Sequence, residues 1–129
     1  MPDTVLLIDR EEAVRRTLGD ALERAGFEVH REAAVAGGVD AAVRLGPDVV
    51  LVDIGLPEAA APGLIADLQS RGAAVVALAA ARDLETAFRA VQLGAESVVA
   101  RDAEPSHIVA AAARAAEKTR LVRQVSHLR

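Results

Sequence analysis

The stretch Pro47-Asp48-Val49-Val50-Leu51-Val52-Asp53 decides the fold. It holds four consecutive β-branched or leucine residues between a Pro-Asp turn and a second aspartate. An unbroken apolar run of this length is typical of a strand that is covered on both faces, as in a parallel sheet. The sequence therefore predicts a buried central strand that carries the carboxylate of Asp53 at its carboxyl end.

Strand-like and helix-like segments alternate on both sides of this run. Short apolar runs predict strands at 4–9, 27–30, 49–53, 75–79 and 97–100, and apolar residues at helical spacing predict helices at 14–25, 33–45, 64–70, 84–93 and from 104 onward. Gly37-Gly38 weakens the second of these helices. The alternation predicts an α/β fold, a five-stranded parallel doubly wound sheet with helices on both faces.

Length and composition limit the class of protein. The chain has 129 residues, of which 52% are hydrophobic and 26% are charged, as expected of a single domain with a buried core. It has no cysteine, so a disulfide framework and a thiol nucleophile are excluded. No apolar stretch reaches the roughly 18 to 20 residues that span a bilayer. We expect a soluble, cytoplasmic protein with no membrane partner.

The charge distribution argues against a nucleic-acid-binding domain. The formal net charge is -4, and only Phe27 and Phe88 are aromatic, so bases would find neither a basic surface nor a stacking platform. The segment 114–129 differs from the rest, because it has five basic residues and one acidic residue. We expect no direct contact between this domain and nucleic acid.

Charged residues follow three of the predicted strands at their carboxyl ends, where doubly wound sheets place their chemistry. Asp9 and Arg10 follow the first strand, Asp53 ends the third, and Arg101 follows the fifth. These residues form the candidate site. A purely structural role for Asp53, as a cap at the end of its strand, is the alternative at this point.

Three motifs resemble the receiver domain of bacterial two-component response regulators. They are Val5-Leu6-Leu7-Ile8-Asp9, the stretch 47–53 followed by Leu56-Pro57, and Asp83-Leu84-Glu85-Thr86-Ala87 leading to Leu93-Gly94-Ala95. The resemblance extends from Val5 to about Ala116. It implies the flavodoxin-like strand order 2-1-3-4-5.

The resemblance also implies a chemistry, the transfer of a phosphoryl group from a histidine kinase to one aspartate with the help of Mg²⁺. Asp53 matches the phosphoacceptor position. Asp9 matches the first of two acids that hold the metal, and Gly55 matches the residue whose carbonyl completes the metal site. Glu11 matches an acid that often follows the pair. If Mg²⁺ is bound, its ligands are expected to be Asp9, Asp53 and Gly55.

The sequence departs from the family pattern at several of these positions. Arg10 stands in place of the second acid, and a guanidinium repels Mg²⁺ and cannot ligate it. Ala79 and Val98 replace the switch hydroxyl and the switch aromatic, Arg101-Asp102 replaces Lys-Pro, and the loop from 57 to 63 is two residues longer than usual. We therefore expect a degenerate receiver, or pseudo-receiver, with no cofactor or only weak Mg²⁺ binding. In this interpretation Arg10 lies within reach of Asp9 and Asp53 and serves as an internal cation.

The last helix is expected to continue past the domain. We divide the chain into a receiver-like domain, 1–116, and a C-terminal helix extension, 117–129. Leu121, Val125 and Leu128 form an apolar stripe on this extension, similar to the linker helix of enhancer-binding transcriptional activators. We expect a homodimer through this helix, and a frayed tail is the alternative.

Three functions are compatible with these patterns. The favoured one is the receiver domain of a response regulator that controls transcription through an output domain and acts mainly by protein–protein interaction. The alternative is a working phosphoacceptor that takes a phosphoryl group from a histidine kinase, with slow self-catalysed transfer to Asp53. A nucleotide-binding domain is disfavoured, because Asp9-Arg10-Glu11-Glu12 is no glycine-rich phosphate loop. We do not expect an enzyme.

Overall fold

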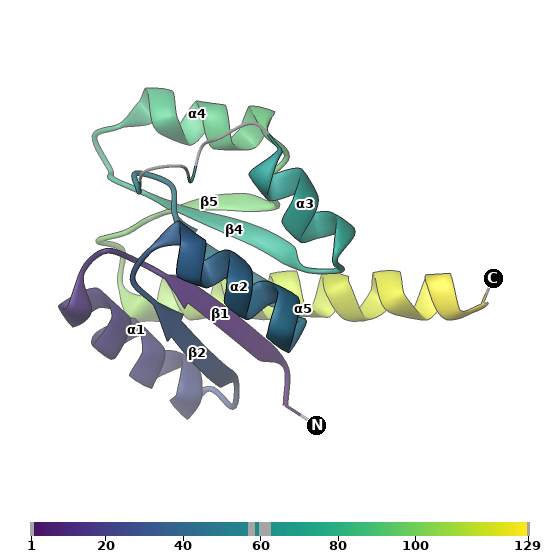
Figure 1. Cartoon of the computed structure of the whole chain (residues 1–129). Helices are drawn as coiled ribbons and strands as arrows, with labels where there is room; N and C mark the ends of the chain where they lie inside the picture. The colour runs from purple at the N-terminus through teal and green to yellow at the C-terminus, as the bar shows by residue number, and fades with distance from the viewer. Residues whose placement is uncertain (1, 57–58, 60–62, 129) are drawn as a thin grey trace.

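Five parallel strands alternate with five helices in the computed structural model, which describes residues 2–56, 59 and 63–128 (Figure 1). Their bounds are β1 Thr4–Ile8, α1 Glu12–Arg24, β2 Glu28–Glu32, α2 Val35–Leu45, β3 Val49–Asp53, α3 Leu64–Ser70, β4 Ala74–Ala79, α4 Leu84–Gln92, β5 Ser97–Ala100 and α5 Pro105–Leu128. No helix in these described ranges is long and apolar enough to cross a membrane.

The sheet has the order β2-β1-β3-β4-β5, and every neighbouring pair is parallel. This confirms the predicted architecture and strand order. Leu51 of β3 pairs with Leu7 of β1 and with Val76 of β4. Because all strands run the same way, residues that follow β1, β3, β4 and β5 meet at one edge of the sheet.

Strand β2 differs from its prediction, because it begins at Glu28 and continues to Glu32 instead of ending at His30. The physical reason is its partner: each of its five residues pairs with one of the five residues of β1, from Thr4 to Ile8. Periodicity within 27–30 could not reveal a length that the neighbouring strand imposes. The polar side chains of β2 suit an edge strand.

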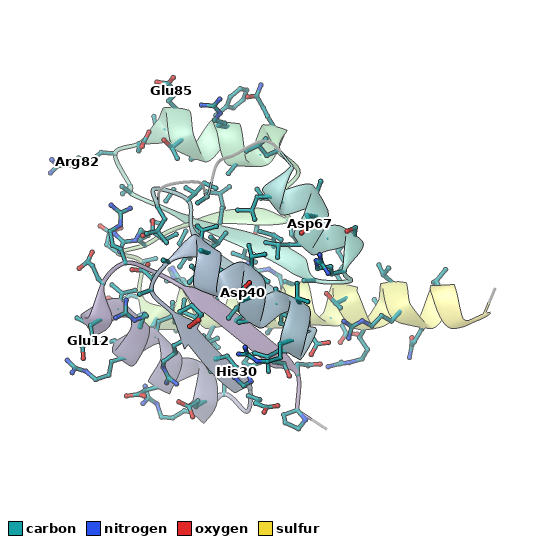
Figure 2. The ribbon with its side chains drawn as sticks, viewed as in Figure 1. Glu12, His30, Asp40, Asp67, Arg82 and Glu85 are labelled. Carbon is teal, nitrogen blue, oxygen red and sulfur yellow. The ribbon has the colours of Figure 1, made fainter. Side chains whose placement is uncertain are left out.

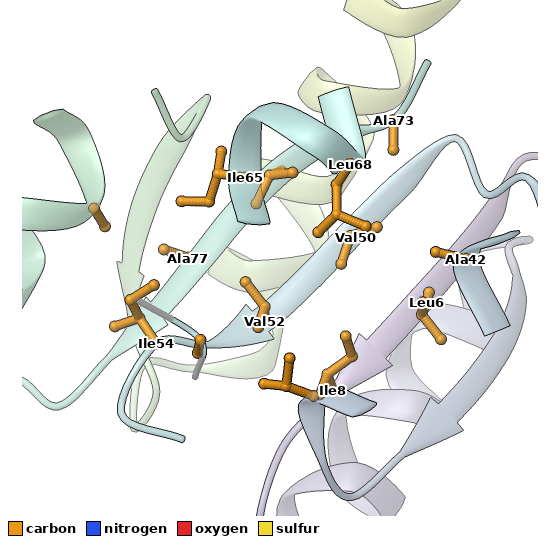
Figure 3. Packing of buried hydrophobic residues seen from close by; sticks show 14 of the residues in the cluster. Leu6, Ile8, Ala42, Val50, Val52, Ile54, Ile65, Leu68, Ala73 and Ala77 are labelled. Atoms are coloured by element: carbon orange, nitrogen blue, oxygen red, sulfur yellow. The ribbon is translucent and has the colours of Figure 1, made fainter. Parts of the chain in front are cut away.

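The core consists of two apolar layers, one on each face of the sheet. Alternate strand residues such as Leu6, Ile8, Val50 and Val52 pack under α2, α3 and α4 (Figure 3). The residues between them pack against α1 and α5 on the opposite face, and they include Val5, Leu7, Val49, Leu51, Val76 and Leu78. Two covered faces explain why β3 is buried at all five positions.

Helix α2 continues through Gly37-Gly38 because the second glycine lies directly against the sheet. A Cβ atom at position 38 would lie 2.3 Å from Cδ1 and 2.8 Å from Cγ1 of Ile8. Gly38 is buried, so the helix gains a close approach to β1 in return for its lower helix propensity.

Helix α5 is long enough to leave the sheet. Its first four turns bury a row of apolar residues against the sheet, and these are Ile108, Ala111, Ala112, Ala115 and Ala116. Beyond them the helix projects past the other elements towards the C-terminus (Figure 1).

The two glycines of α2 generate opposite predictions for stability. Gly37→Ala should raise the free energy of unfolding by about 0.5 to 1 kcal/mol, because alanine favours the helix and the new Cβ meets only the movable carboxylate of Glu32. Gly38→Ala should lower it by about 1 kcal/mol, because overpacking against Ile8 exceeds that gain. Urea unfolding at pH 7 measures both. Equal stabilisation by the two variants would show that the contact with Ile8 imposes no constraint.

Candidate functional site

Charged side chains cover the outside of the molecule, as those of Glu12, Asp40 and Glu85 illustrate (Figure 2). Among the charged residues that the structure describes, only Asp9 and Asp53 are fully buried. They lie at the carboxyl edge of the sheet, just after β1 and at the end of β3. Two buried carboxylates at adjacent strand ends require compensating charge or hydrogen bonds.

Arg10 supplies that compensation to Asp53. Its guanidinium donates from Nε to Oδ2 at 2.7 Å and from Nη2 to Oδ1 at 2.8 Å. This is a two-pronged pair that uses both carboxylate oxygens, the geometry in which arginine binds carboxylates most strongly. The side chain of Arg10 is 47% exposed, so it covers the buried aspartate from the solvent side.

Arg101 supplies the compensating charge and hydrogen bonds to Asp9. Its Nε donates to Oδ2 at 3.0 Å, and its Nη2 donates to Oδ1 at 2.6 Å. The same Nη2 reaches Oε1 of Glu11 at 2.9 Å, and Nε lies 3.5 Å from Oδ2 of Asp53. With only 14% of its side chain exposed, Arg101 is the inner cation of the site.

Backbone groups hold the two carboxylates in place. The N–H of Gly55 donates to Oδ1 of Asp53 at 3.1 Å, and the N–H of Glu11 donates to Oδ1 of Asp9 at 2.9 Å. Arg15, one turn into α1, donates to the carbonyl oxygen of Asp9 at 2.7 Å. The sequence analysis missed Arg15, because an arginine on an amphipathic helix is normally a solvated surface residue.

The arginines influence the protonation of Asp53. Burial by itself raises the pKa of Asp53, but the hydrogen bond from Arg10, the charge of Arg101 and the N–H of Gly55 outweigh burial and lower that pKa below its ordinary value. The pKa of Arg10 is raised, chiefly by its hydrogen bond to Asp53. The pKa of Arg101 is raised by its hydrogen bond to Asp9. Asp53 is therefore ionised at neutral pH.

The donor set in this arrangement does not fit a divalent cation. Mg²⁺ requires oxygen ligands in a near-octahedral shell, yet all four carboxylate oxygens of Asp9 and Asp53 already accept from guanidinium N–H groups. The Arg10 guanidinium also lies against Gly55, where a Cβ would come within 2.2 Å of Nη2. Within the described ranges no three His, Cys, Asp or Glu side chains are grouped to hold a metal.

The structure places the remaining site positions as follows. Ala79 ends β4 and is buried, and its carbonyl oxygen accepts from the N–H of Arg101 at 2.9 Å. Val98 lies in β5 and packs against the apolar layer under α2, α3 and α4. Asp102 is exposed to solvent. Pro57 and most of the loop that was expected to be longer lie outside the described residues.

The structure brings the predicted site positions together, but it differs from the prediction in one pairing. Asp9, Arg10, Glu11, Asp53, Gly55 and Arg101 all come together at one edge of the sheet. The strand pattern predicts this for Asp9, Arg10, Asp53 and Arg101, and the family resemblance implies it for Glu11 and Gly55. Arg10 was expected to serve both aspartates, whereas its hydrogen bonds go to Asp53 and those of Arg101 go to Asp9. This division depends on the positions of the side chains in space, which a single sequence does not contain.

The architecture agrees with that of known proteins. Residues 5–113 match the model of the response regulator receiver domain family. The chain is 31% identical over 115 residues to the transcriptional regulatory protein FixJ of Azorhizobium caulinodans, a match that covers 86% of the chain and 54% of FixJ. It is 32% identical over 98 residues to the KDP operon transcriptional regulatory protein KdpE of Escherichia coli, which covers 75% of the chain and 44% of KdpE.

A solved structure shows the same fold. The crystal structure of NtrX from Brucella abortus superposes with a TM-score of 0.88 at 26% identity, over the whole of this chain and 30% of NtrX. The chain thus spans about half the length, or less, of these relatives. With a family model that covers most of its length and with the family's strand order, the chain belongs to the response regulator receiver domains, a family of signalling modules related to transcriptional regulators.

Proposed function

We propose that this chain is the receiver domain of a transcriptional regulator in which arginine replaces the metal ion, and that it acts mainly through protein–protein contacts. The observation that carries the proposal is the two-pronged pair between Arg10 and Asp53, which engages both oxygens of the phosphoacceptor position. A carboxylate held in this way is neutralised from within, so the fold does not need Mg²⁺ at this point.

The charges around the site support weak Mg²⁺ binding or none. Asp9, Glu11 and Asp53 contribute three negative charges, and Arg10 and Arg101 contribute two positive charges that already lie on these carboxylates. An incoming cation would have to displace a guanidinium from a partly dehydrated site and then remain close to it. The absence of a hydroxyl at Ala79 supports the same interpretation, because a phosphoryl group on Asp53 would find no switch donor there.

A working phosphoacceptor is the second candidate function. Two observations favour it: the lowered pKa of Asp53 keeps this residue in the nucleophilic form, and Arg10 is half exposed and can leave without unfolding the core. In that case a histidine kinase would donate the phosphoryl group, and slow self-catalysed transfer to Asp53 would depend on movement of Arg10.

The partners follow from the class of regulator. Because the matched relatives extend well beyond the receiver-like segment, we infer an output domain in a longer protein and a histidine kinase or another signalling protein as the upstream partner. We assign this work to the cytoplasm of a bacterial cell, where regulators of transcription act.

Self-association is part of the proposal. Leu121 and Val125 on the extension 117–129 are 51% and 54% exposed, one turn apart on the same side of α5. The side chain of Leu128, the third member of the expected stripe, lies outside the described residues. We propose that the domain 1–116 pairs with a second copy through this helix, because exposed apolar residues at helical spacing mark a partner surface.

Exchange of Arg10 tests the loss of the metal site. Arg10→Asp should create Mg²⁺ binding at millimolar concentration, because it removes the guanidinium and restores a second acid beside Asp9. Wild-type protein and Arg16→Asp, which makes the same charge change on the exposed side of α1, should bind Mg²⁺ at least tenfold more weakly. Titration calorimetry measures the affinities. Wild-type binding as tight as that of Arg10→Asp would refute the electrostatic argument.

The same proteins distinguish the two candidate functions. After incubation with a small phosphodonor, with and without Mg²⁺, intact mass should show little phosphorylated wild-type protein, and Arg10→Asp should gain a phosphoryl group only with Mg²⁺. Asp53→Asn is the control for the site of modification. Efficient phosphorylation of wild-type protein that Asp53→Asn abolishes would establish the second candidate.

The ion pair also predicts how stability depends on pH. Because the folded-state pKa of Asp53 is lowered, its stabilising contribution is complete above its unfolded pKa of about 3.9 and is lost as pH falls through the folded value.

Arg10→Met removes the largest cause that lowers the pKa of Asp53, so burial raises this pKa and the contribution of Asp53 to stability shrinks or reverses. The free energy of unfolding at pH 7 should fall by about 1 to 3 kcal/mol, and adding Asp53→Asn should recover most of it. Urea unfolding of the wild-type protein, the two single variants and the double variant between pH 3.5 and 7 measures this coupling. Additive changes in the free energy of unfolding would contradict it.

Sedimentation tests the proposed dimer. Leu121→Asp with Val125→Asp should leave a folded monomer, whereas the wild-type mass should rise with concentration, because a stripe in water gains by pairing. Arg114→Asp with Gln124→Asp adds acidic residues to the same helix outside the stripe and should still associate. The same mass for all three proteins at every concentration would remove the stripe as a dimer element.

A further inference from the structure

Three basic residues of α5, namely Lys118, Arg120 and Arg123, form what we call the basic arm. Three acidic residues of the sheet, namely Asp3, Asp48 and Glu96, form what we call the acidic rim. Each rim residue immediately precedes a strand: Asp3 precedes β1, Asp48 precedes β3 and Glu96 precedes β5. The rim therefore lies along the amino edge of the parallel sheet, at the opposite end from Asp53.

Each residue of the basic arm pairs with one residue of the acidic rim. Arg120 Nη2 lies 2.6 Å from Oδ2 of Asp3. Lys118 pairs with Glu96, and Arg123 pairs with Asp48. The contacts thus join residues 118–123 of α5 to the amino ends of β1, β3 and β5.

Asp48 is the centre of this contact. Its Oδ2 accepts the backbone N–H of Thr4 at 2.7 Å, and its carboxylate also pairs with Arg123. Its carbonyl oxygen accepts the hydroxyl of Thr119 at 2.9 Å and the backbone N–H of Ala74 at 3.0 Å. Residue 48 therefore ties α5 to the amino ends of β1, β3 and β4.

These contacts continue after the apolar packing of α5 ends. Ala116 is the last buried apolar residue of the helix, and Thr119 is still buried beside Asp48. Leu121, Val122 and Val125 are each more than half exposed, so this part of the helix is held to the sheet mainly by the cations and by the hydroxyl of Thr119. One exposed ion pair contributes little to stability, but three pairs along two turns of a rigid helix together restrict the direction of that helix.

We propose that the acidic rim is a docking surface for the basic arm and that this intramolecular contact fixes the direction in which α5 leaves the domain. Any segment that follows α5 in a longer regulator would then be held at a set orientation to the sheet. Because the pairs are partly exposed, salt weakens the contact, and charge reversal releases the arm. The proposal does not depend on the state of Asp53.

Distance measurements between two spin labels test this proposal, and the chain has no cysteine that would interfere with labelling. Asp40→Cys on α2 and Gln124→Cys on α5 carry the labels, and dilution with unlabelled protein removes distances between copies. At low salt the distribution of distances should be narrow. Arg120→Glu with Arg123→Glu should widen it about twofold and should quicken amide exchange in the last described turns of α5 several-fold. High salt should do the same to the unchanged arm.

Two further proteins make the result specific. Arg16→Glu with Arg114→Glu changes the same total charge outside the arm and should keep the narrow distribution. Arg120→Asp should widen it, and adding Asp3→Arg should restore it, because the exchanged charges can pair again. Thermal unfolding verifies that each variant is folded.

Equal widths for the arm variant and the wild-type protein would show that helix packing alone orients α5, and would overturn the proposal. Equal widening by the arm variant and by the variant outside the arm would overturn it as well. Neither result bears on Mg²⁺ binding by Arg10→Asp, so this proposal and the proposed function can fail separately.

Discussion

Two buried carboxylates at one edge of a parallel sheet are the constraint on which the rest of this structure depends. Asp9 and Asp53 lie there because their strands are adjacent and parallel, and neither side chain reaches solvent. Each has its own two-pronged arginine, Arg10 from the loop after β1 and Arg101 from the loop after β5. The site therefore joins the ends of β1, β3 and β5 through ion pairs.

The sequence predicted the elements that depend on local pattern. The run 49–52, the helical spacing of the apolar residues and the glycines at turns were sufficient for five strands, five helices and a common site edge. Strand order came from the family resemblance. The length of β2 was misjudged, because β1 determines it.

The sequence predicted which residues lie at the site, but only the structure shows which of them pair with each other. The pattern put Asp53, Arg10 and Arg101 at one edge, but it could not assign Arg101 to Asp9, since that choice depends on the positions of the side chains in space. Arg15 was missed because, in the sequence, it is an arginine on an amphipathic helix like any solvated one. The acidic rim has a readable mark, an acid just before three of the strands, although its meaning needs the position of α5.

The length of α5 has a mechanical consequence. A helix of 24 residues is about 36 Å long, and its first four turns lie on alanines, whose small side chains interlock little with the sheet. Packing by small side chains hinders separation of α5 from the sheet more than it hinders a change in the angle of α5 on the sheet. A change of about 10° in the angle of α5 on the sheet would displace the C-terminal end of the helix by several ångströms, because displacement grows with distance from the packed turns. On the proposed role of the basic arm, a small change at the amino edge of the sheet would be enlarged at the far end of α5.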